Sequence, residues 1–266
     1  MTGTNTAKVL APVVYLESYK GGLRAKEPKI RKDGEVKRTR NHKEEGVSSE
    51  VYAFRTAAEI NEMLNIFNSE INTAIMKQKI GYITNNDKEK IARRNKLLFI
   101  IGINIGIRAS DIRLLQWRNF FDDNGKFREF YNLKPQKTKK TGKFVKLYFN
   151  KAIKKAIKEY ISVFPIEDYN DYLFSSKSGK PITVQTIWNV VKNTAKKAGI
   201  TQNIGTHSLR KTWGYWVWHE AADKNMALVL LQKCFAHSST EVTMKYIGIS
   251  DEDIQGVYEG ICLGFG

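Results

Sequence analysis

Residues 236–246 read AHSSTEVTMKY, and the interpretation of the whole chain starts from this stretch. His237 precedes Tyr246 by nine residues, and the two serines after the histidine favour a helix start, because a serine side chain accepts hydrogen bonds from free backbone N–H groups. Taken alone, Tyr246 is best explained as an ordinary half-buried aromatic residue. Whether it carries chemistry depends on what the rest of the sequence supplies.

A second motif, Thr206-His207-Ser-Leu-Arg210, lies upstream. Thr206 is the expected N-cap of a helix, which puts His207 and Arg210 one turn apart on the same face. The free N–H groups and the dipole of a helix N-terminus favour an anion, and an arginine beside them adds a permanently charged clamp for phosphate. A single His-x-x-Arg also arises by coincidence, so the motif has weight only together with the others.

A third motif, Gly106-Ile-Arg108-Ala-Ser-Asp111, lies at the end of an apolar run over residues 97–107. Asp111 is three residues after Arg108, on the next helical turn, and is expected to hold the guanidinium in a fixed pose. A purely structural Arg–Asp pair is the alternative.

A lysine cluster, QKTKKTG at residues 136–142, lies where a β-turn is expected. The runs 127–133 and 144–149 are rich in β-prone residues, so the turn between them predicts a hairpin. Lysines on such a turn are usually solvated surface; alternatively, one of them holds an ammonium group against DNA. Lys137, Lys139 and Lys140 are the candidates.

The remaining pattern is mostly helical. Thr56 and Glu59 form a capping box that starts an apolar stripe at helical spacing. Further helices are expected from Asp87 through 97–103, over 110–117, over 153–161, over 187–198 and, as several short pieces, from 206 to 263. Helices, one hairpin and more helices predict a mainly α fold with a small antiparallel β-sheet (α+β).

The chain has 266 residues and carries 44 Lys and Arg against 27 Asp and Glu, a formal charge of +17. This excess indicates a polyanionic partner such as nucleic acid. Residues 1–48 are rich in Lys and Arg and poor in core-forming residues, which predicts a flexible basic arm that contacts DNA. An inert solvated tail is the alternative. Residues 49–266 are expected to form one globular domain, in which Lys192, Lys196 and Lys197 are further candidates for DNA contact.

Other classes of protein are disfavoured. The apolar run 97–107 is too short to span a membrane, and the N-terminus lacks the features of a secretion signal. Cys234 and Cys262 match no metal spacing and are expected to be reduced in a cytoplasmic protein. No metal and no organic cofactor is expected.

Together the motifs resemble the tyrosine recombinase (phage integrase) family. Its signature is an arginine in Gly-x-Arg-x-Ser-Glu/Asp, a lysine on a β-hairpin, His-x-x-Arg, and Gly-His-Ser-Ser with the tyrosine nine residues after the histidine. The corresponding residues occur here in the same order, within about residues 50–266: Arg108, Lys140, His207, Arg210, His237 and Tyr246. The resemblance implies that residues 49–266 form the catalytic domain of an enzyme that breaks and rejoins DNA without metal.

The resemblance also implies a role for each residue. Tyr246 attacks a backbone phosphate and forms a 3′-phosphotyrosine bond, with His207 as the base. Arg108 and Arg210 clamp the non-bridging phosphate oxygens, Lys140 protonates the departing 5′ oxygen, and His237 hydrogen-bonds a non-bridging oxygen. Asp111 supports Arg108.

Some features depart from the family pattern. Ala236 replaces the glycine that usually precedes the histidine, a mild change. The pattern Lys-Thr-x-x-x-Val fits Lys140, with Lys139 as its rival. Only the basic arm, and no separate helical core-binding domain, is expected before the catalytic domain, so the chain resembles the family's minimal members, such as the short fimbrial phase-variation invertases, or a truncated form.

The expected partner is double-stranded DNA at a specific site, in a bacterial, phage or mobile-element setting. A homotetramer is expected through the apolar segment after Tyr246, with packing of that segment in cis as the alternative. Accessory DNA-bending proteins stay open. A type IB topoisomerase, a telomere-resolving enzyme and a DNA-binding protein with a vestigial site are the competing interpretations. The sequence does not specify the target site, or choose between integration, excision, inversion and resolution.

Overall fold

The structure is a computed structural model of the whole chain, and it describes residues 50–81, 86–137 and 144–249. The predicted basic arm, the hairpin lysines Lys139 and Lys140, Cys262 and most of the apolar C-terminal segment lie outside the described residues. The division of the chain at residue 48 therefore stays a prediction.

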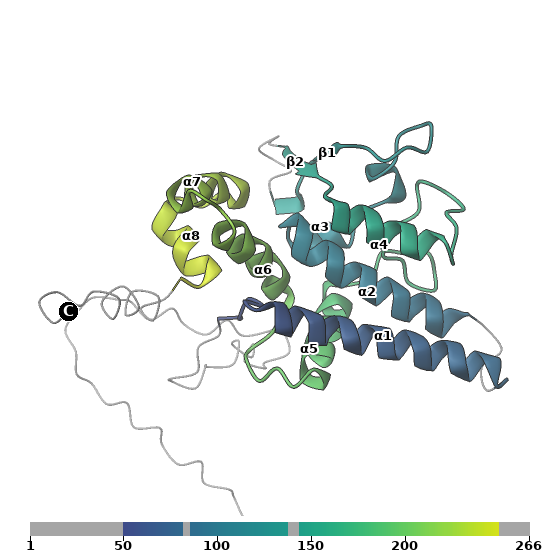
Figure 1. Cartoon of the computed structure of the whole chain (residues 1–266). Coiled ribbons are helices and arrows are strands. Elements are labelled where there is room, and N and C mark those ends of the chain that lie inside the picture. The colour runs from purple at the N-terminus through teal and green to yellow at the C-terminus, as the bar shows by residue number, and fades with distance from the viewer. Residues whose placement is uncertain (1–49, 82–85, 138–143, 250–266) are drawn as a thin grey trace, which may run out of the picture. The chain divides into compact units, whose positions relative to one another are not determined.

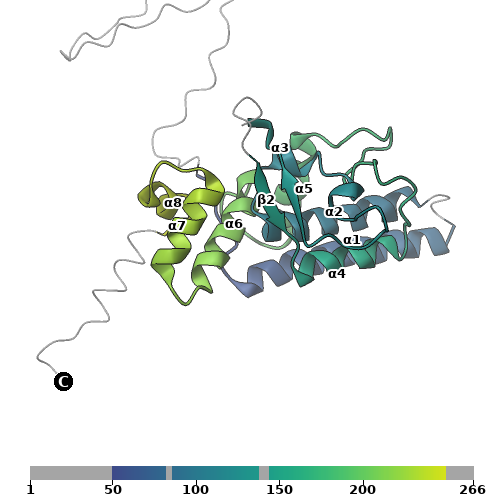
Figure 2. The same cartoon turned by 90° about the horizontal axis from the view of Figure 1, so that it is seen from above.

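Three helices form the largest layer of the described fold: α1 (Ala57–Lys79), α2 (Asp87–Ile105) and α4 (Lys151–Ile161). Figures 1 and 2 show them side by side, with α2 in contact with both α1 and α4. The predicted capping box is present, because Thr56 accepts from the Glu59 backbone N–H and the Glu59 carboxylate accepts from the Thr56 backbone N–H. Local capping thus fixes where α1 begins.

The core of this layer is built from aromatic rings. The Phe99 ring on α2 lies 5.6 Å from the Phe54 ring and 5.5 Å from the Phe67 ring, measured between centroids, and all three side chains are fully buried. Such rings bury large apolar areas and prefer tilted or edge-on contacts. Residues 97–103 of the helix expected from Asp87 pack into this core, although Ile100 and Ile103 are only partly buried.

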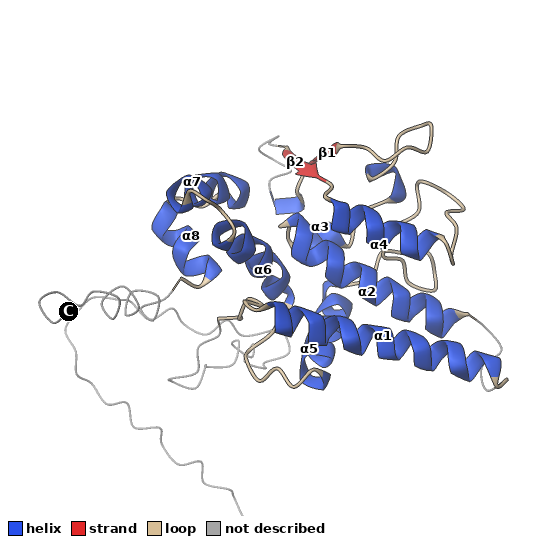
Figure 3. Ribbon diagram, in the orientation of Figure 1, coloured by secondary structure: helices blue, strands red, loops and turns tan. Residues whose placement is uncertain are grey.

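A short helix and a hairpin follow α2 in the chain. The hairpin consists of β1 (Phe130–Leu133) and β2 (Val145–Tyr148), antiparallel, with Phe130 opposite Tyr148 (Figure 3). The mainly α fold with one small antiparallel sheet is confirmed, although both strands are shorter than the runs predicted.

The helix expected over 110–117 is shorter than predicted. It is represented by α3 (Ala109–Ile112) and a 3-10 turn, η1 (Trp117–Asn119). Between them the backbone turns to residues 171–173, because Leu173 N donates to Leu115 O and Trp117 N donates to Asp171 O. These long-range bonds replace the ones that would have continued the helix.

The C-terminal part contains α5 (Val184–Lys197), α6 (Thr206–His219), α7 (Lys224–Phe235) and α8 (Thr240–Ile247). A second, smaller core is formed by Leu228, Leu231 and Phe235 of α7 and Ile247 of α8, with the α6 residues Trp213 and Trp218 packed against it. The predicted N-cap at Thr206 is wrong: the cap is Gly205, whose N–H donates to Ser208 Oγ, and Thr206 is the first helical residue. The predicted helix start after His237 is confirmed, with Ser239 as the N-cap of α8.

Within the described residues, no helix is both long enough and apolar enough to cross a membrane. Cys234, on α7, is a free thiol.

Candidate active site

Two helices bring a histidine and a tyrosine together. His207 is the second residue of α6, and Tyr246 lies in the last turn of α8, next to α6 in Figure 1. The His207 Nδ1 and the Tyr246 hydroxyl oxygen are 3.2 Å apart, within hydrogen-bond distance. Two motifs 39 residues apart in sequence therefore meet at one point.

Arg210 lies one turn after His207 and is almost completely buried. Its Nη1 donates to Gly106 O at 2.8 Å and its Nη2 donates to Phe235 O at 3.3 Å. Its guanidinium also lies 4.4 Å from the centroid of the Phe235 ring, and its charge lowers the pKa of the Tyr246 phenol. Backbone carbonyls from the ends of α2 and α7 thus hold this cation in one pose against the phenol.

Arg108 reaches the same site from the turn after α2. Gly106 ends α2 in the left-handed conformation (φ 67°), and Arg108 is the N-cap of α3. An added Cβ at Gly106 would meet the Trp213 ring of α6, so glycine is required both by its φ and by the close packing. The charge of Arg108 lowers the pKa values of His207, His237 and Tyr246, which places it within electrostatic reach of all three.

Asp111 does not act as predicted. Within the described part of the chain it forms no ion pair with Arg108, and its Oδ1 instead accepts from Gln136 N at 2.8 Å. Its carboxylate is buried, so this bond replaces lost hydration. Asp111 therefore fixes the start of the turn between the two strands to α3, where Arg108 also lies.

His237 follows α7 and lies edge-on to Tyr246, with 5.0 Å between ring centroids. Its Nδ1 is 3.1 Å from Thr243 Oγ1, and its backbone N–H donates to Gln232 O. Ala236, before it, adopts the left-handed conformation (φ 55°) as the C-cap of α7. The glycine expected at this position is thus replaced by a residue that pays a conformational cost there.

Burial dominates the protonation of the site. Desolvation raises the pKa of Tyr246 above its ordinary value, although Arg210 and Arg108 oppose it. Desolvation and the charges of Arg210, Arg108 and Lys211 lower the pKa of His207, and burial with the two arginines lowers that of His237. At neutral pH the phenol is therefore protonated and both imidazoles are neutral, so His207 can accept the phenolic proton.

Lys211 is a site residue that sequence reasoning missed. It follows Arg210 directly and is buried, with its Nζ 2.5 Å from Glu50 Oε1 and 5.4 Å from the centroid of the Tyr246 ring. Its position beside Arg210 was the one available signal, but nothing local predicts that this lysine faces inward.

The other residues predicted to contact DNA are lysines on α5 and in the turn of the hairpin. Lys192, Lys196 and Lys197 are exposed on α5, as their prediction requires, with Lys197 paired to Glu70 at 2.5 Å and Lys192 over the Trp188 ring. Lys139 and Lys140 lie outside the described residues, so the structure does not choose between them.

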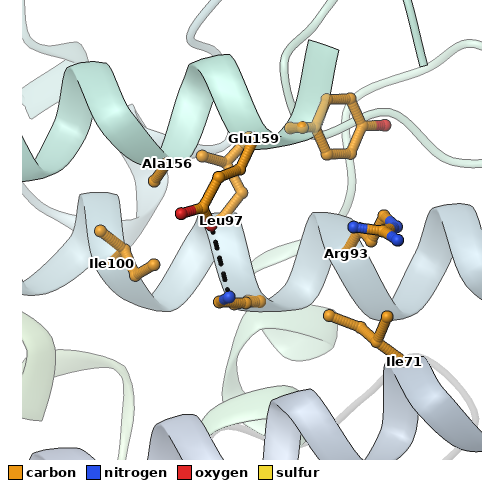
Figure 4. A pocket seen from close by; sticks show the side chains of 8 residues that line it. Ile71, Arg93, Leu97, Ile100, Ala156 and Glu159 are labelled. Carbon is orange, nitrogen blue, oxygen red and sulfur yellow. Dashed lines mark hydrogen bonds and ion pairs between the residues drawn. The ribbon is translucent and has the colours of Figure 1, made fainter. Parts of the chain in front are cut away.

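A pocket elsewhere in the fold contains none of the site residues. Figure 4 shows it between α1, α2 and α4, lined by Ile71, Leu97, Ile100 and Ala156 among others. Of its charged groups, Lys96 pairs with Glu159 at 3.4 Å, and Arg93 pairs at 2.7 Å with Glu89, which does not line the pocket. Nothing in it converges as the side chains around Tyr246 do.

Comparison with known proteins gives a family and close relatives. Residues 60–253 match the model of the phage integrase family. The chain is 33% identical over 179 residues to a Bacillus subtilis protein described as "Probable integrase/recombinase YoeC", covering 67% of this chain and 87% of that one. It is also 33% identical over 86 residues to the tyrosine recombinase XerD of Staphylococcus saprophyticus, but spans 28% of that protein.

Solved structures share the fold. The XerA recombinase matches with a TM-score of 0.55 at 18% identity, over 82% of this chain and 66% of that one. The XerH site-specific recombinase, in a post-cleavage complex with its palindromic difH substrate, matches with a TM-score of 0.55 at 18% identity. This match covers 87% of this chain and 59% of the XerH chain.

Proposed function

The chain belongs to the phage integrase family, and from that membership we propose that it is a site-specific DNA recombinase that cleaves and rejoins strands through Tyr246. The observation that carries the proposal is the convergence of Tyr246, His207 and Arg210, held by hydrogen bonds that local folding alone does not require. The site thus combines a nucleophile, a neutral base and fixed positive charge.

The first step is attack by the phenol on phosphorus. The Tyr246 oxygen forms a bond to phosphorus while its proton passes to His207 Nδ1, 3.2 Å away. A phenol has an ordinary pKa of about 10 and needs such a base, or a cationic field, to become a good nucleophile at neutral pH. The neutral state of His207 supports this role.

The second requirement is stabilisation of charge on the phosphorane. Arg108 and Arg210 present guanidinium groups, and each preorganised donor of this kind contributes about 3 kcal/mol to transition-state stabilisation. The bond from phosphorus to the 5′ oxygen then breaks, and the ammonium of Lys140 donates its proton to that oxygen. The product is a 3′-phosphotyrosine and a free 5′-hydroxyl. The 5′-hydroxyl of a partner strand can attack the phosphotyrosine and so rejoin the DNA without an external energy source.

The assembly belongs to the same proposal. The partner is double-stranded DNA at a specific site, bound through phosphate contacts from basic residues. The chain acts as a homotetramer through its C-terminal segment, since strand exchange requires active subunits on two duplexes.

Covalent trapping tests the proposal. Nicked duplexes drawn from the DNA that flanks the gene are incubated with the protein, and protein–DNA adducts are resolved by denaturing electrophoresis. The wild type is expected to form an adduct at one site, whereas Tyr246→Phe forms none because it lacks the nucleophilic oxygen. Identical behaviour of the two proteins would remove Tyr246 from the mechanism.

A second measurement separates strand exchange from cleavage alone. Two labelled duplexes that both carry the trapped site are mixed, and Holliday junctions are sought by native electrophoresis. A recombinase forms junctions, whereas a topoisomerase-like or telomere-resolving enzyme forms adducts with no junction between duplexes.

A further inference from the structure

The segment that leads into α1 is bound to the helices of the active site. We call residues 50–55 the lead segment. Three hydrogen bonds hold this segment. Tyr52 N donates to Asn203 O at 2.8 Å, Phe54 N donates to Thr212 Oγ1 at 2.9 Å, and Trp216 Nε1 donates to Phe54 O at 2.9 Å. The lead segment is therefore fixed to α6 and to the loop before it.

Arg55, the last residue of the lead segment, contacts both α6 and the end of α8. Its guanidinium carbon lies 5.4 Å from the centroid of the Tyr215 ring on α6 and 5.5 Å from that of Tyr52. Its Nη2 donates to the backbone oxygen of Gly248. Gly248 is the left-handed C-cap of α8 (φ 81°) and lies two residues after Tyr246.

This contact suits the end of a helix. The last carbonyl groups of a helix lack partners within it, and the dipole makes that end favourable for a cation. α8 has eight residues, which is too short to be stable without tertiary contacts. An added Cβ at Gly248 would collide with the Arg55 guanidinium, so the two groups are in tight contact.

We infer that Arg55 is a positioning residue for Tyr246, because it anchors the C-terminal end of α8 and so holds the phenol beside His207. Tyr246 lies in the last turn of α8, and a shift of that turn moves its hydroxyl directly. The effect on reaction rate rests on the proposed function, whereas the anchoring of α8 does not.

The test compares Arg55→Ala with Arg94→Ala. Arg94 is a matched control, because its guanidinium also donates to a backbone oxygen, that of Ser175 at 2.9 Å, and its buried Nε is likewise unpartnered. Single-turnover adduct formation on a nicked duplex trapped by the wild type is expected to slow about 10- to 100-fold in Arg55→Ala, since small misplacements of a nucleophile have effects of this size. Arg94→Ala should react at the wild-type rate, and both variants should bind the duplex as the wild type does.

Three further readouts distinguish positioning from other roles. The defect of Arg55→Ala should persist at high pH, because Arg55 orients the phenol and does not ionise it. It should also persist on a duplex whose scissile 5′ oxygen is replaced by sulfur, a leaving group that needs no general acid. Arg55→Lys keeps the charge without the planar group between the two rings and should recover part of the rate. A defect removed by high pH or by the sulfur substrate would overturn the inference.

Hydrogen exchange decides the anchoring without DNA. Amides of residues 240–249 should exchange faster in Arg55→Ala than in the wild type. In Arg94→Ala the same amides should exchange at the wild-type rate. Unchanged exchange in Arg55→Ala, or faster exchange with a wild-type adduct rate, would overturn the inference. A wild type that forms no adduct, together with faster exchange in Arg55→Ala, would refute the proposed function and leave the anchoring standing.

Discussion

At the scale of single residues, the site is organised around one proton that starts on Tyr246. Burial keeps the phenol protonated, and burial with three nearby cations keeps His207 neutral. A protonated donor and a neutral acceptor 3.2 Å apart are the arrangement that general-base catalysis needs. The same cations later face the charged phosphorane.

Cleavage is expected to slow as the pH falls through the lowered pKa of His207, which lies below the ordinary histidine value of 6.5. A protonated imidazole cannot accept the phenolic proton. Single-turnover adduct formation between about pH 5 and 8 measures this limb. His207→Gln should be slower and should not show this fall of the rate at low pH. A fall centred above pH 6.5, or one retained in the variant, would contradict the assignment of His207 as the base.

The same shift predicts how stability depends on pH. A histidine whose pKa is lowered on folding binds more protons in the unfolded state, so the free energy of unfolding falls as the pH drops below 6.5. His237 acts in the same direction. Urea denaturation at about pH 7.5 and 5.5 should show a smaller loss in the His207→Gln/His237→Gln variant than in the wild type. An equal loss would assign the pH dependence to other groups.

Ala236 holds a left-handed conformation that costs an alanine about 1–2 kcal/mol. Glycine removes this strain but has more freedom to lose on folding, which costs about 0.5–1 kcal/mol. Ala236→Gly is therefore expected to stabilise the protein by about 0.5–1 kcal/mol in urea denaturation, with an unchanged rate of adduct formation. Destabilisation would show that the Ala236 methyl group packs usefully.

The limits of sequence reasoning at this scale concern distance along the chain. His207, His237 and Tyr246 were recognisable because each belongs to a short motif. Arg55 and Lys211 were not, because Arg55 meets Gly248 across 193 residues and Lys211 meets Glu50 across 161. Asp111 was assigned to its neighbour Arg108, whereas its partner is Gln136.

At the scale of elements, periodicity predicted most helices because their apolar faces repeat every turn. α1, α4 and α5 form where helical spacing predicted them, and each buries part of its predicted apolar face. Periodicity failed where long-range bonds take over, as in the short α3 and its turn toward residues 171–173. Periodicity also did not predict which helices pack against one another, because that depends on where small side chains leave room for a neighbouring helix.

Gly214 shows this dependence where α6, α7 and α8 meet. An added Cβ would lie 2.7 Å from Phe235 Cζ and 2.8 Å from Ile247 Cγ2, both in the small core beneath Tyr246. Gly214→Ala is expected to destabilise the protein by about 1–3 kcal/mol, the usual cost of overpacking. Because the clash displaces α8, adduct formation should also slow, as measured beside urea denaturation.

Gly81→Ala is the control for this prediction. Gly81 has a positive φ of 72° but nothing within 4 Å of an added Cβ. Its substitution should cost stability through backbone strain alone and leave adduct formation unchanged. A similar slowing in both variants would show that lost stability, not displacement of α8, reduces the rate.

At the scale of the whole molecule, the positive charge is spread beyond the active site. Residues 1–48 hold eleven Lys and Arg against six Asp and Glu, so they contribute five of the seventeen net charges. The rest belongs to residues 49–266. DNA affinity therefore depends on which of these charges reach phosphates, a question that net charge alone does not answer.

Salt dependence separates arm contacts from general attraction. Each phosphate contact contributes about 0.9 to the slope of log K against log salt concentration, because a bound cation releases a counterion from DNA. Glutamine at three arm lysines, Lys26, Lys29 and Lys32, is compared with glutamine at three exposed lysines of α4, Lys151, Lys155 and Lys158. Both variants lose three positive charges, and the α4 variant serves as the control because α4 carries no residue of the active site. If the arm binds DNA, its variant should lose about two to three units of slope, measured by fluorescence anisotropy, and the α4 variant much less. Equal losses would mean that the arm adds only net charge, and an unchanged slope in the arm variant would make it an inert solvated tail.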